Sequence, residues 1–431
     1  MTKESSLRPS YKVNFAMLLI ASLLYLLNFT TGNDSISLFV TLLLALYLFF
    51  AKKEVLLPTM IYLSFFAVTM VYGHTYLSFF IVLAFFTRVI VDGTFKAQMM
   101  VFYFIVYFLI QIISTDVGTL SIGRINEILS FFLVLPAGYA FRKCKSKDCI
   151  LYFITGFFIS TLFGIARFYL PRLDEVAGDT DVTPLENMSE VYRFSGISND
   201  SNFYAILAIV TLFILFFKVS TSIQIQKSIS KVITMVLLIV TFVLGLMTFS
   251  KSFVVCALFL FVVYYIGVKK CSRSYLIIVS TICIIMYFVF SSTISEIVSA
   301  YLLRFGDDSS DMDMITSNRT VIWSGYLEDI SNFSFFEILF GAGMVHEGKV
   351  AAHNTYIQLF YEFGIVGFIT NLLLLFKSKT VFVKEKLAKY SFVIMALLVV
   401  LFFNLSGYTF SSAWAVFTIM FISCSDNEIM I

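Results

Sequence analysis

The chain has 431 residues, of which 59% are hydrophobic and only 13% are charged. An ordinary soluble domain carries about 25% charged residues, so a soluble fold could not bury this much apolar surface. A bilayer can accept it, because a hydrocarbon core of about 30 Å suits apolar helices of about 20 residues. The apolar runs lack the alternation of barrel strands. The composition therefore predicts an all-α, polytopic membrane protein and excludes a soluble enzyme.

Fourteen apolar stretches of roughly spanning length follow one another, and merging of short neighbours would reduce them to 12 or 13. In chain order they cover residues 13–29, 36–51, 55–72, 76–91, 98–113, 126–141, 149–170, 202–218, 232–249, 253–268, 274–291, 355–376, 389–404 and 409–423. No cleavage pattern precedes the first, which we expect to be retained. We predict one integral-membrane domain over residues 1–431, with two longer loops at 171–201 and 292–354.

The distribution of Lys and Arg predicts the orientation. With the N-terminus in the cytoplasm and alternation at every span, 22 of the 30 basic residues lie on the cytoplasmic side, as the positive-inside rule requires. Both long loops then face outward, and both termini are cytoplasmic. The net charge of +3 is explained by these cytoplasmic clusters, so it gives no indication of a nucleic-acid partner.

The first outer loop ends in Arg193, followed by Asn199, Asp200, Ser201 and Asn202 at the start of an apolar span. These polar residues suit a helix N-cap. The positive end of that helix and Arg193 would together form an anion site, since helix N-termini bind phosphate readily. The alternative is a capped helix with a solvated arginine.

The second outer loop carries four carboxylates, Asp307, Asp308, Asp311 and Asp313. Oxygen ligands of this kind can hold a divalent ion, but the run matches no calcium-loop pattern and is more typical of a solvated segment. We therefore expect no metal.

The same loop continues with Arg319, after which Ile322, Tyr326 and Ile330 recur at helical spacing. This pattern predicts an amphipathic helix that begins near Arg319 and docks on the membrane bundle. Gly341-Ala-Gly343 then predicts a turn before the chain re-enters the membrane.

His353 and Asn354 lie at that re-entry point. The N-terminus of another helix would face the outer side there. Imidazole is the most frequent general base in enzymes, although a hydrogen-bonded anchor is the alternative. Glu362 lies about two turns inside the span, where a charge is costly and indicates function, unless it is protonated or paired with Lys251.

Lys251 lies between Ser250 and Ser252 in a tight outer turn. A lysine on the outer side opposes the positive-inside bias, which suggests anion binding, and a solvated loop lysine is the alternative. Charge counting thus places Arg193, Lys251, Arg319 and His353 on one face. Two or three cations with a base suit a lipid-linked phosphate or diphosphate.

Taken together, several motifs carry a family resemblance. They are Arg193-Phe-Ser-Gly196 with Asn199 and Asn202, Ser250-Lys251-Ser252, Arg319 with Trp323, Gly341-Ala-Gly343, His353-Asn354, and Glu362-Phe-Gly364-Ile-Val-Gly367. The chain resembles the O-antigen polymerase and O-antigen ligase superfamily over about residues 190–370, most specifically over 341–367. It departs from the family's pattern at two places. Lys251 stands where the family usually has arginine, and Asn199-Asp-Ser-Asn202 stands where the family usually has Asn-Pro-Asn.

The resemblance implies an inner-membrane glycosyltransferase of the C-type integral-membrane architecture, with an active site on the periplasmic side. It implies undecaprenyl-diphosphate-linked oligosaccharides as substrates, with no nucleotide sugar, cofactor or metal. Arg193 and Arg319 would bind the diphosphate with support from Lys251, and His353 would deprotonate or position the acceptor hydroxyl. Asn202, Asn354 and Glu362 would support them. A chain-length regulator and a flippase are the candidate protein partners.

The favoured function is a polysaccharide polymerase of the Wzy type, which moves a growing glycan onto a new lipid-linked repeat unit. An O-antigen ligase that delivers the glycan to lipid A-core uses the same donor and stays open. A lipid-linked oligosaccharide flippase is the alternative from another class. Transporters tend to show repeated halves and charges deep within spans, and the sequence has no repeat and few such charges.

Overall fold

A computed structural model describes residues 9–31, 33–66, 76–114, 136–137, 140, 146–169, 182–185, 188–197, 201–222, 228–267, 319–343 and 352–382. The predicted spans 274–291, 389–404 and 409–423, and nearly all of 126–141, lie outside these residues. Asn199, Asp200 and the four carboxylates Asp307, Asp308, Asp311 and Asp313 also lie outside them.

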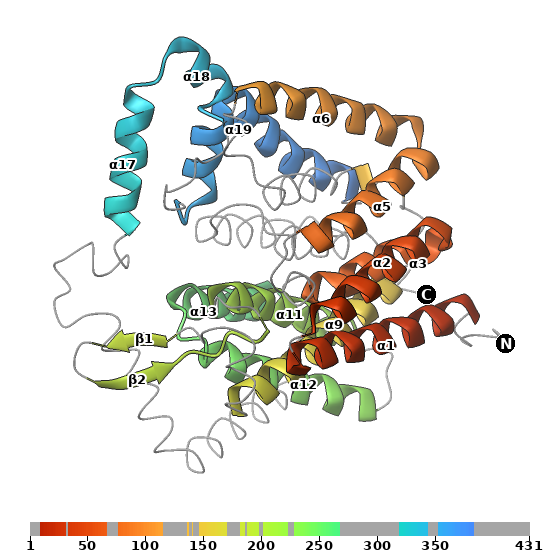
Figure 1. The fold of residues 1–431 in the computed structure, drawn as a ribbon. Helices are drawn as coiled ribbons and strands as arrows, with labels where there is room; N and C mark the ends of the chain where they lie inside the picture. The colour runs from red at the N-terminus through yellow and green to blue at the C-terminus, as the bar shows by residue number, and fades with distance from the viewer. Residues whose placement is uncertain are drawn as a thin grey trace.

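The described part is helical apart from one short hairpin, as the all-α prediction requires (Figure 1). Its helices are α1 (Pro9–Thr31), α2 (Asp34–Phe50), α3 (Lys53–Leu63), the 3-10 helix η1 (Ser64–Phe66), α5 (Tyr76–Asp92), α6 (Phe95–Ser114), α9 (Ser146–Tyr169), α11 (Ser201–Ser222), α12 (Ser228–Leu246), α13 (Lys251–Gly267), α17 (Arg319–Ser331), α18 (Phe335–Phe340) and α19 (Thr355–Phe382). The strands β1 (Val182–Leu185) and β2 (Met188–Tyr192) pair antiparallel, with Val182 opposite Tyr192. The sequence did not predict this hairpin within the first outer loop.

One of the described helices, over Cys149–Ala166 of α9, is long and apolar enough to cross a membrane. Shorter apolar helices, of 10 to 17 residues, lie within α1, α2, α6, α11, α12, α13 and α19. Where the structure describes the predicted spans between 13 and 113 and between 149 and 268, they are helical except at Ala51, after the end of α2, and at 247–249, after the end of α12.

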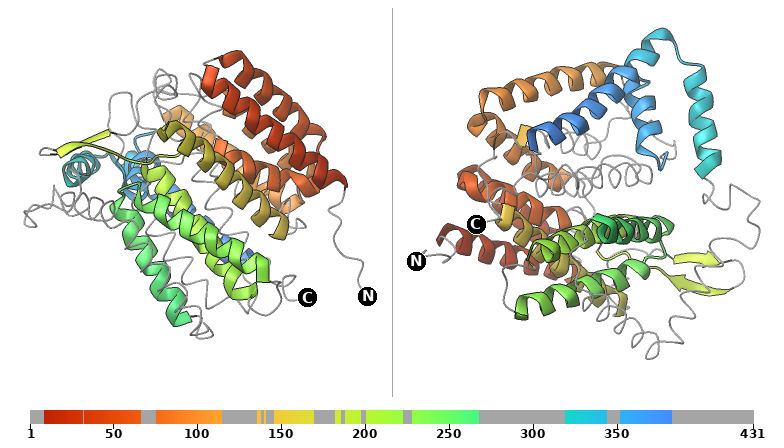
Figure 2. Two further views of the ribbon diagram at one scale, coloured as in Figure 1. Left: turned by 90° about the horizontal axis from the view of Figure 1, so that it is seen from below. Right: turned by 180° about the vertical axis from the view of Figure 1, so that it is seen from behind.

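The helices form one packed bundle. α2 packs against α5, α3 against α9, and α11 against α9, α12 and α13. Leu359 and Phe363 of α19 belong to the same buried apolar core as residues of α1, α2 and α3. In all views of Figures 1 and 2, β1–β2 and the start of α17 lie at one end of the molecule and the start of α1 at the opposite end.

A network of paired polar side chains lies inside the bundle, around Asn14. The Asn14 amide nitrogen donates to the Tyr152 hydroxyl at 2.9 Å, and its oxygen accepts from Tyr47 at 2.7 Å and from Thr59 at 3.1 Å. This one amide links α1, α2, α3 and α9. Because buried polar groups without partners are costly, the network also specifies how these four helices fit together.

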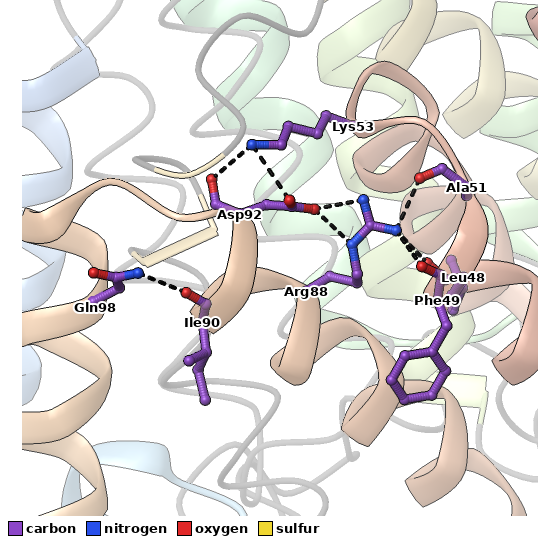
Figure 3. A network of polar contacts seen from close by, with 8 residues as sticks. All are labelled: Leu48, Phe49, Ala51, Lys53, Arg88, Ile90, Asp92 and Gln98. Atoms are coloured by element: carbon purple, nitrogen blue, oxygen red, sulfur yellow. Dashed lines mark hydrogen bonds and ion pairs between the residues drawn. The ribbon is translucent and has the colours of Figure 1, made fainter.

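Arg88 closes the C-terminal end of α2 (Figure 3). Its Nη1 donates to the carbonyl oxygens of Phe49 at 2.6 Å and Ala51 at 2.9 Å, and its Nη2 forms an ion pair with Asp92 at 2.5 Å. The last carbonyls of a helix have no partner within it, so a cation at this position satisfies and stabilises them. Lys53 adds a second ion pair to Asp92 at 3.4 Å.

α18 begins with a capping box. Ser334 accepts from the amide of Glu337 at 3.3 Å, and the Glu337 carboxylate accepts from the amide of Ser334 at 2.8 Å. These hydrogen bonds hold the pKa of Glu337 below its usual range. The box satisfies otherwise unpaired amides and sets where the short helix starts, and hence where the Gly341 turn follows.

Candidate functional site

Arg193 follows β2 and is buried, with 6% of its surface exposed. Its Nε donates to the carbonyl oxygen of Thr248 at 3.0 Å, and its Nη2 donates to the Oδ1 of Asn202 at 3.4 Å. The neighbouring amide of Phe194 donates to the carbonyl of Met247 at 2.9 Å. The guanidinium therefore joins three segments: the end of the hairpin, the first turn of α11, and the turn between α12 and α13.

The motif around Arg193 is held between two helices. Gly196 has a φ of +64°, and a side chain there would collide with the ring of Tyr204 on α11. The Tyr204 hydroxyl pairs with Thr161 of α9 at 3.0 Å, and its ring packs edge-on against Phe194. Glycine is thus required at 196 by both backbone conformation and space. These contacts fix the segment that carries Arg193.

The turn that carries Lys251 reaches the same place. Ser250 donates through Oγ to the Oδ1 of Asn202 at 3.1 Å and pairs with the Ser252 hydroxyl at 2.9 Å. Lys251 itself is the first residue of α13 and is partly exposed. Hydrogen bonds therefore join Arg193 and Ser250 to Asn202, and Lys251 follows Ser250 in the chain. We call these four residues the Arg193 cluster. Their predicted grouping with Arg319 and His353 in a single site stays a prediction.

A second cluster forms around the start of α19. Trp323 on α17 donates through its indole nitrogen to the carbonyl oxygen of Ala352 at 2.8 Å. Arg319 is the first residue of α17 and lies four residues before Trp323, so both share one helix face. Since Ala352 precedes His353, the indole holds the start of α17 beside that histidine. We call Arg319, Trp323, His353 and Asn354 the His353 cluster.

α17 docks on α19 through aromatic side chains. Tyr326 is buried, and its ring packs edge-on against Tyr361 with 5.0 Å between centroids. Ile322 and Ile330 pack against this pair. The predicted helix starts at Arg319 and docks through these three positions, but Val321 and Leu327 are exposed, so its apolar side chains are not confined to the docked face.

His353 has a φ of +47°, and Phe249, beside the Lys251 turn, has a φ of +49°. Within the described ranges these are the residues other than glycine with positive φ. Such conformations are strained for side chains with a Cβ and concentrate at functional sites. The His353 cluster thus contains one strained residue, and the other, Phe249, directly precedes Ser250 of the Arg193 cluster.

Asn354 caps α19. Its Oδ1 accepts from the amides of Tyr356 at 3.0 Å and Ile357 at 3.3 Å, and only 3% of the residue is exposed. An N-cap of this kind stabilises a helix by about 1 kcal/mol. The predicted supporting role of Asn354 is therefore structural: it determines where the helix starts and hence where His353 lies.

The glycine turn after α18 packs against the backbone of α19 near a break in that helix. Gly364, with a φ of +60°, interrupts the helix, and the Tyr361 carbonyl near this break accepts from the amide of Ala342 at 2.8 Å. Gly341, with a φ of +85°, lies against the backbone of Glu362 so closely that a side chain would collide with it. The predicted turn at Gly341-Ala-Gly343 is confirmed, and its glycines allow this contact.

Glu362 is buried, with 1% of its surface exposed, and its Oε1 accepts from the Nε2 of Gln358 at 2.9 Å. This bond gives the carboxyl a partner on its own helix. Sequence reasoning missed Gln358, although its spacing of four residues from both Asn354 and Glu362 was available as a signal.

The hairpin β1–β2, which precedes Arg193, and the start of α17, which begins with Arg319, lie at one end of the molecule (Figures 1 and 2). The two clusters combine the cations Arg193, Lys251 and Arg319 with the N-terminal ends of α11, α13 and α19. Helix N-termini and guanidinium groups both favour anions. Within the described ranges, no group of three or more His, Cys, Asp or Glu side chains is placed to hold a metal ion.

Comparison with protein-family models gave no match for the chain, and comparison with curated proteins gave none either. A function for these clusters therefore has to be inferred from their own residues and geometry.

Proposed function

We propose that the chain is a polytopic membrane glycosyltransferase of the inner membrane, with both termini cytoplasmic, acting on undecaprenyl-diphosphate-linked glycans at the periplasmic surface. The surface of α2 supports membrane insertion, because it exposes a helical stripe of large apolar side chains: Leu38, Phe39, Leu42, Leu43, Leu46, Phe49 and Phe50. Soluble monomers rarely expose apolar patches of this kind. The polar network around Asn14 is buried inside the bundle, away from this apolar surface.

The ligand that suits the clusters best is a diphosphate with a lipid tail. Arg193, Lys251 and Arg319 supply positive charge, and Ser250 and Asn202 supply polar atoms beside it. A planar guanidinium can bind two phosphate oxygens at once, and helix N-termini add partial positive charge. Neither a metal nor a nucleotide is needed for this recognition, which agrees with the family that the motifs resemble.

The reaction follows from these groups. The hydroxyl oxygen of an acceptor sugar attacks the anomeric carbon of the donor glycan, and its proton passes to the imidazole of His353. The new glycosidic C–O bond forms as the bond from the anomeric carbon to the phosphate oxygen breaks. That electron pair leaves with undecaprenyl diphosphate, which becomes one charge unit more negative. Arg193, Lys251 and Arg319 stabilise the added charge.

The single observation that carries the proposal is the position of His353. It adopts a strained backbone at the start of α19, and Trp323 fastens the helix that begins with Arg319 beside it. A base at a helix N-terminus, adjacent in the chain to the point where the helix that begins with Arg319 is fastened, suits proton abstraction coupled to departure of a diphosphate.

Polymerase is favoured over ligase by the outer loops. The loop over 292–354 is fairly short, and in the predicted topology the outer side carries eight of the 30 basic residues. A ligase must also dock a polyanionic lipid A-core, for which more outer cations are expected.

Deletion of the gene in its host, followed by electrophoresis of surface polysaccharide, tests the proposal. Loss of a polymerase leaves core with one repeat unit, loss of a ligase leaves bare core, and loss of a flippase stops export. The deletion strain should regain polymer with the wild-type gene but not with His353→Ala. Polymer of normal length in the deletion strain would rule out the proposed function.

A further inference from the structure

Three polar side chains lie on one face of the first half of α19. Asn354, Gln358 and Glu362 are spaced four residues apart, which places them on one side of a helix. They are 3%, 3% and 1% exposed. A rise of 1.5 Å per residue makes the stripe about 12 Å long, and it begins next to His353. Polar groups in an apolar helix are costly and usually mark a functional site.

The middle residue has an atom without a partner. Gln358 donates through Nε2 to Glu362 at 2.9 Å, whereas its Oε1 is buried and has no hydrogen-bond partner among the residues that the structure describes. Nearly all buried polar atoms in proteins are hydrogen-bonded, so such an exception calls for an explanation. A buried acceptor without a donor lowers stability, and a donor that arrives with a ligand would satisfy it.

The orientation of the Gln358 amide is held from two directions. A carboxylate only accepts hydrogen bonds, so Glu362 draws the amide nitrogen toward itself and turns the oxygen away. Glu362 is itself held, because its backbone packs against Gly341 and the neighbouring Tyr361 carbonyl accepts from Ala342. The glycine turn therefore fixes Glu362, and Glu362 fixes Gln358.

We propose that Gln358 is a sugar-binding residue whose Oε1 accepts a hydrogen bond from a hydroxyl group of the glycan beside His353. This inference rests on the proposed function and names a residue that selects its substrate. Sugar hydroxyls are donors that match a lone acceptor oxygen. Two sugars meet at the reacting centre: the donor sugar bonded to the diphosphate, and the terminal sugar of the acceptor.

The test uses the full-length protein in lipid nanodiscs. The donor is the undecaprenyl-diphosphate-linked repeat unit isolated from a host strain that lacks the gene. The acceptor is the same repeat unit released from its lipid by mild acid, which has no diphosphate and can only accept. The variants are Gln358→Met, which keeps the shape of the side chain, and the control Thr241→Val. Thr241 is also buried but bonds only within α12, to Leu237.

Gln358→Met should raise one KM by about 3- to 10-fold, the loss expected for one hydrogen bond, with a smaller change in kcat. A rise in the donor KM assigns the bond to the donor sugar, and a rise in the acceptor KM assigns it to the acceptor. Thr241→Val should change neither. If the wild-type protein polymerises and Gln358→Met keeps both KM values, the inference is wrong and Gln358 is structural. A wild-type protein that forms no polymer removes the proposed function and this inference with it.

A double variant that exchanges the residues at 358 and 362 distinguishes loss of sugar binding from misfolding. Gln358→Glu with Glu362→Gln keeps an amide–carboxyl bond between the two positions and keeps an acceptor oxygen at 358. This pair should restore a KM close to that of the wild type. A swap that restores thermal stability in nanodiscs but leaves the KM raised to the level of Gln358→Met would contradict the assignment.

Discussion

The indole nitrogen of Trp323 donates to the carbonyl oxygen of Ala352 at 2.8 Å, across 29 residues of chain. This bond fastens the first turn of α17 to the residue before His353. The α17 helix starts with Arg319, so one hydrogen bond determines how far the cation lies from the histidine.

Replacement of Trp323 by phenylalanine should keep the packing of α17 but remove this bond. We expect transfer to slow by about 3- to 10-fold, because one hydrogen bond is lost and Arg319 is less well placed. The measurement is the transfer rate per inserted protein. Ser324→Ala is the matched control, since Ser324 is exposed and bonds only within α17, to Val321. Equal rates for both variants would contradict the positioning role.

His353→Ala should abolish polymer while the protein is still inserted at a normal level. His353→Gly separates the base from the anchor, because glycine adopts the positive φ of this residue without strain. We expect the glycine variant to be as stable as the wild type and equally inactive. Wild-type polymer from either variant, measured by gel of surface polysaccharide, would favour the anchor interpretation.

Arg193→Ala and Arg319→Ala should eliminate activity, since each lost contact of about 2–3 kcal/mol at the transition state slows turnover by roughly 30- to 150-fold. Lysine should retain only part of the activity, because it presents one compact charge in place of a planar fork. Arg193→Lys should in addition lower thermal stability, since the Arg193 side chain bonds Thr248 and Asn202.

Arg88→Lys is the control for these arginine variants. Arg88 bonds backbone carbonyls at the end of α2, so its replacement should lower thermal stability and leave turnover per folded protein unchanged. An equal loss of turnover in Arg88→Lys would show that the arginine effects are not specific to the candidate site.

Addition of EDTA should change transfer by less than about 2-fold, because the cations take the place of a metal in binding the diphosphate. The measurement is polymer formation in nanodiscs before and after chelation. A requirement for a divalent ion would instead implicate Asp307, Asp308, Asp311 and Asp313 and overturn the mechanism.

Cysteines introduced into a cysteine-free protein should report the orientation. A thiol reagent that cannot cross the membrane should label positions 180 and 310 from outside but not 145, 272 or 380, as the distribution of basic residues predicts. Labelling of position 272 from outside would break the alternation that places both clusters on one face.

Local patterns in the amino-acid sequence were sufficient for several features. The period of Ile322, Tyr326 and Ile330 predicted α17 and its docking face, and Gly341 and Gly343 predicted the turn. Apolar runs predicted the helices α1, α2 and α11. These features depend on neighbours within a few residues, where periodicity and glycine conformation are informative.

Other features depend on contacts between distant segments, and no local pattern reveals them. Asn202 meets Ser250 across 48 residues, and Arg193 meets Thr248 across 55. The sequence likewise did not predict the β1–β2 hairpin or the break in α19 at Gly364, near which Ala342 donates to the Tyr361 carbonyl. Nor did it predict that Gln358 Oε1 lacks a partner among the described residues. Residue types and spacings identified the candidate cations and the candidate base. Their grouping into two clusters required the folded chain, because packing between helices selects which polar atoms meet.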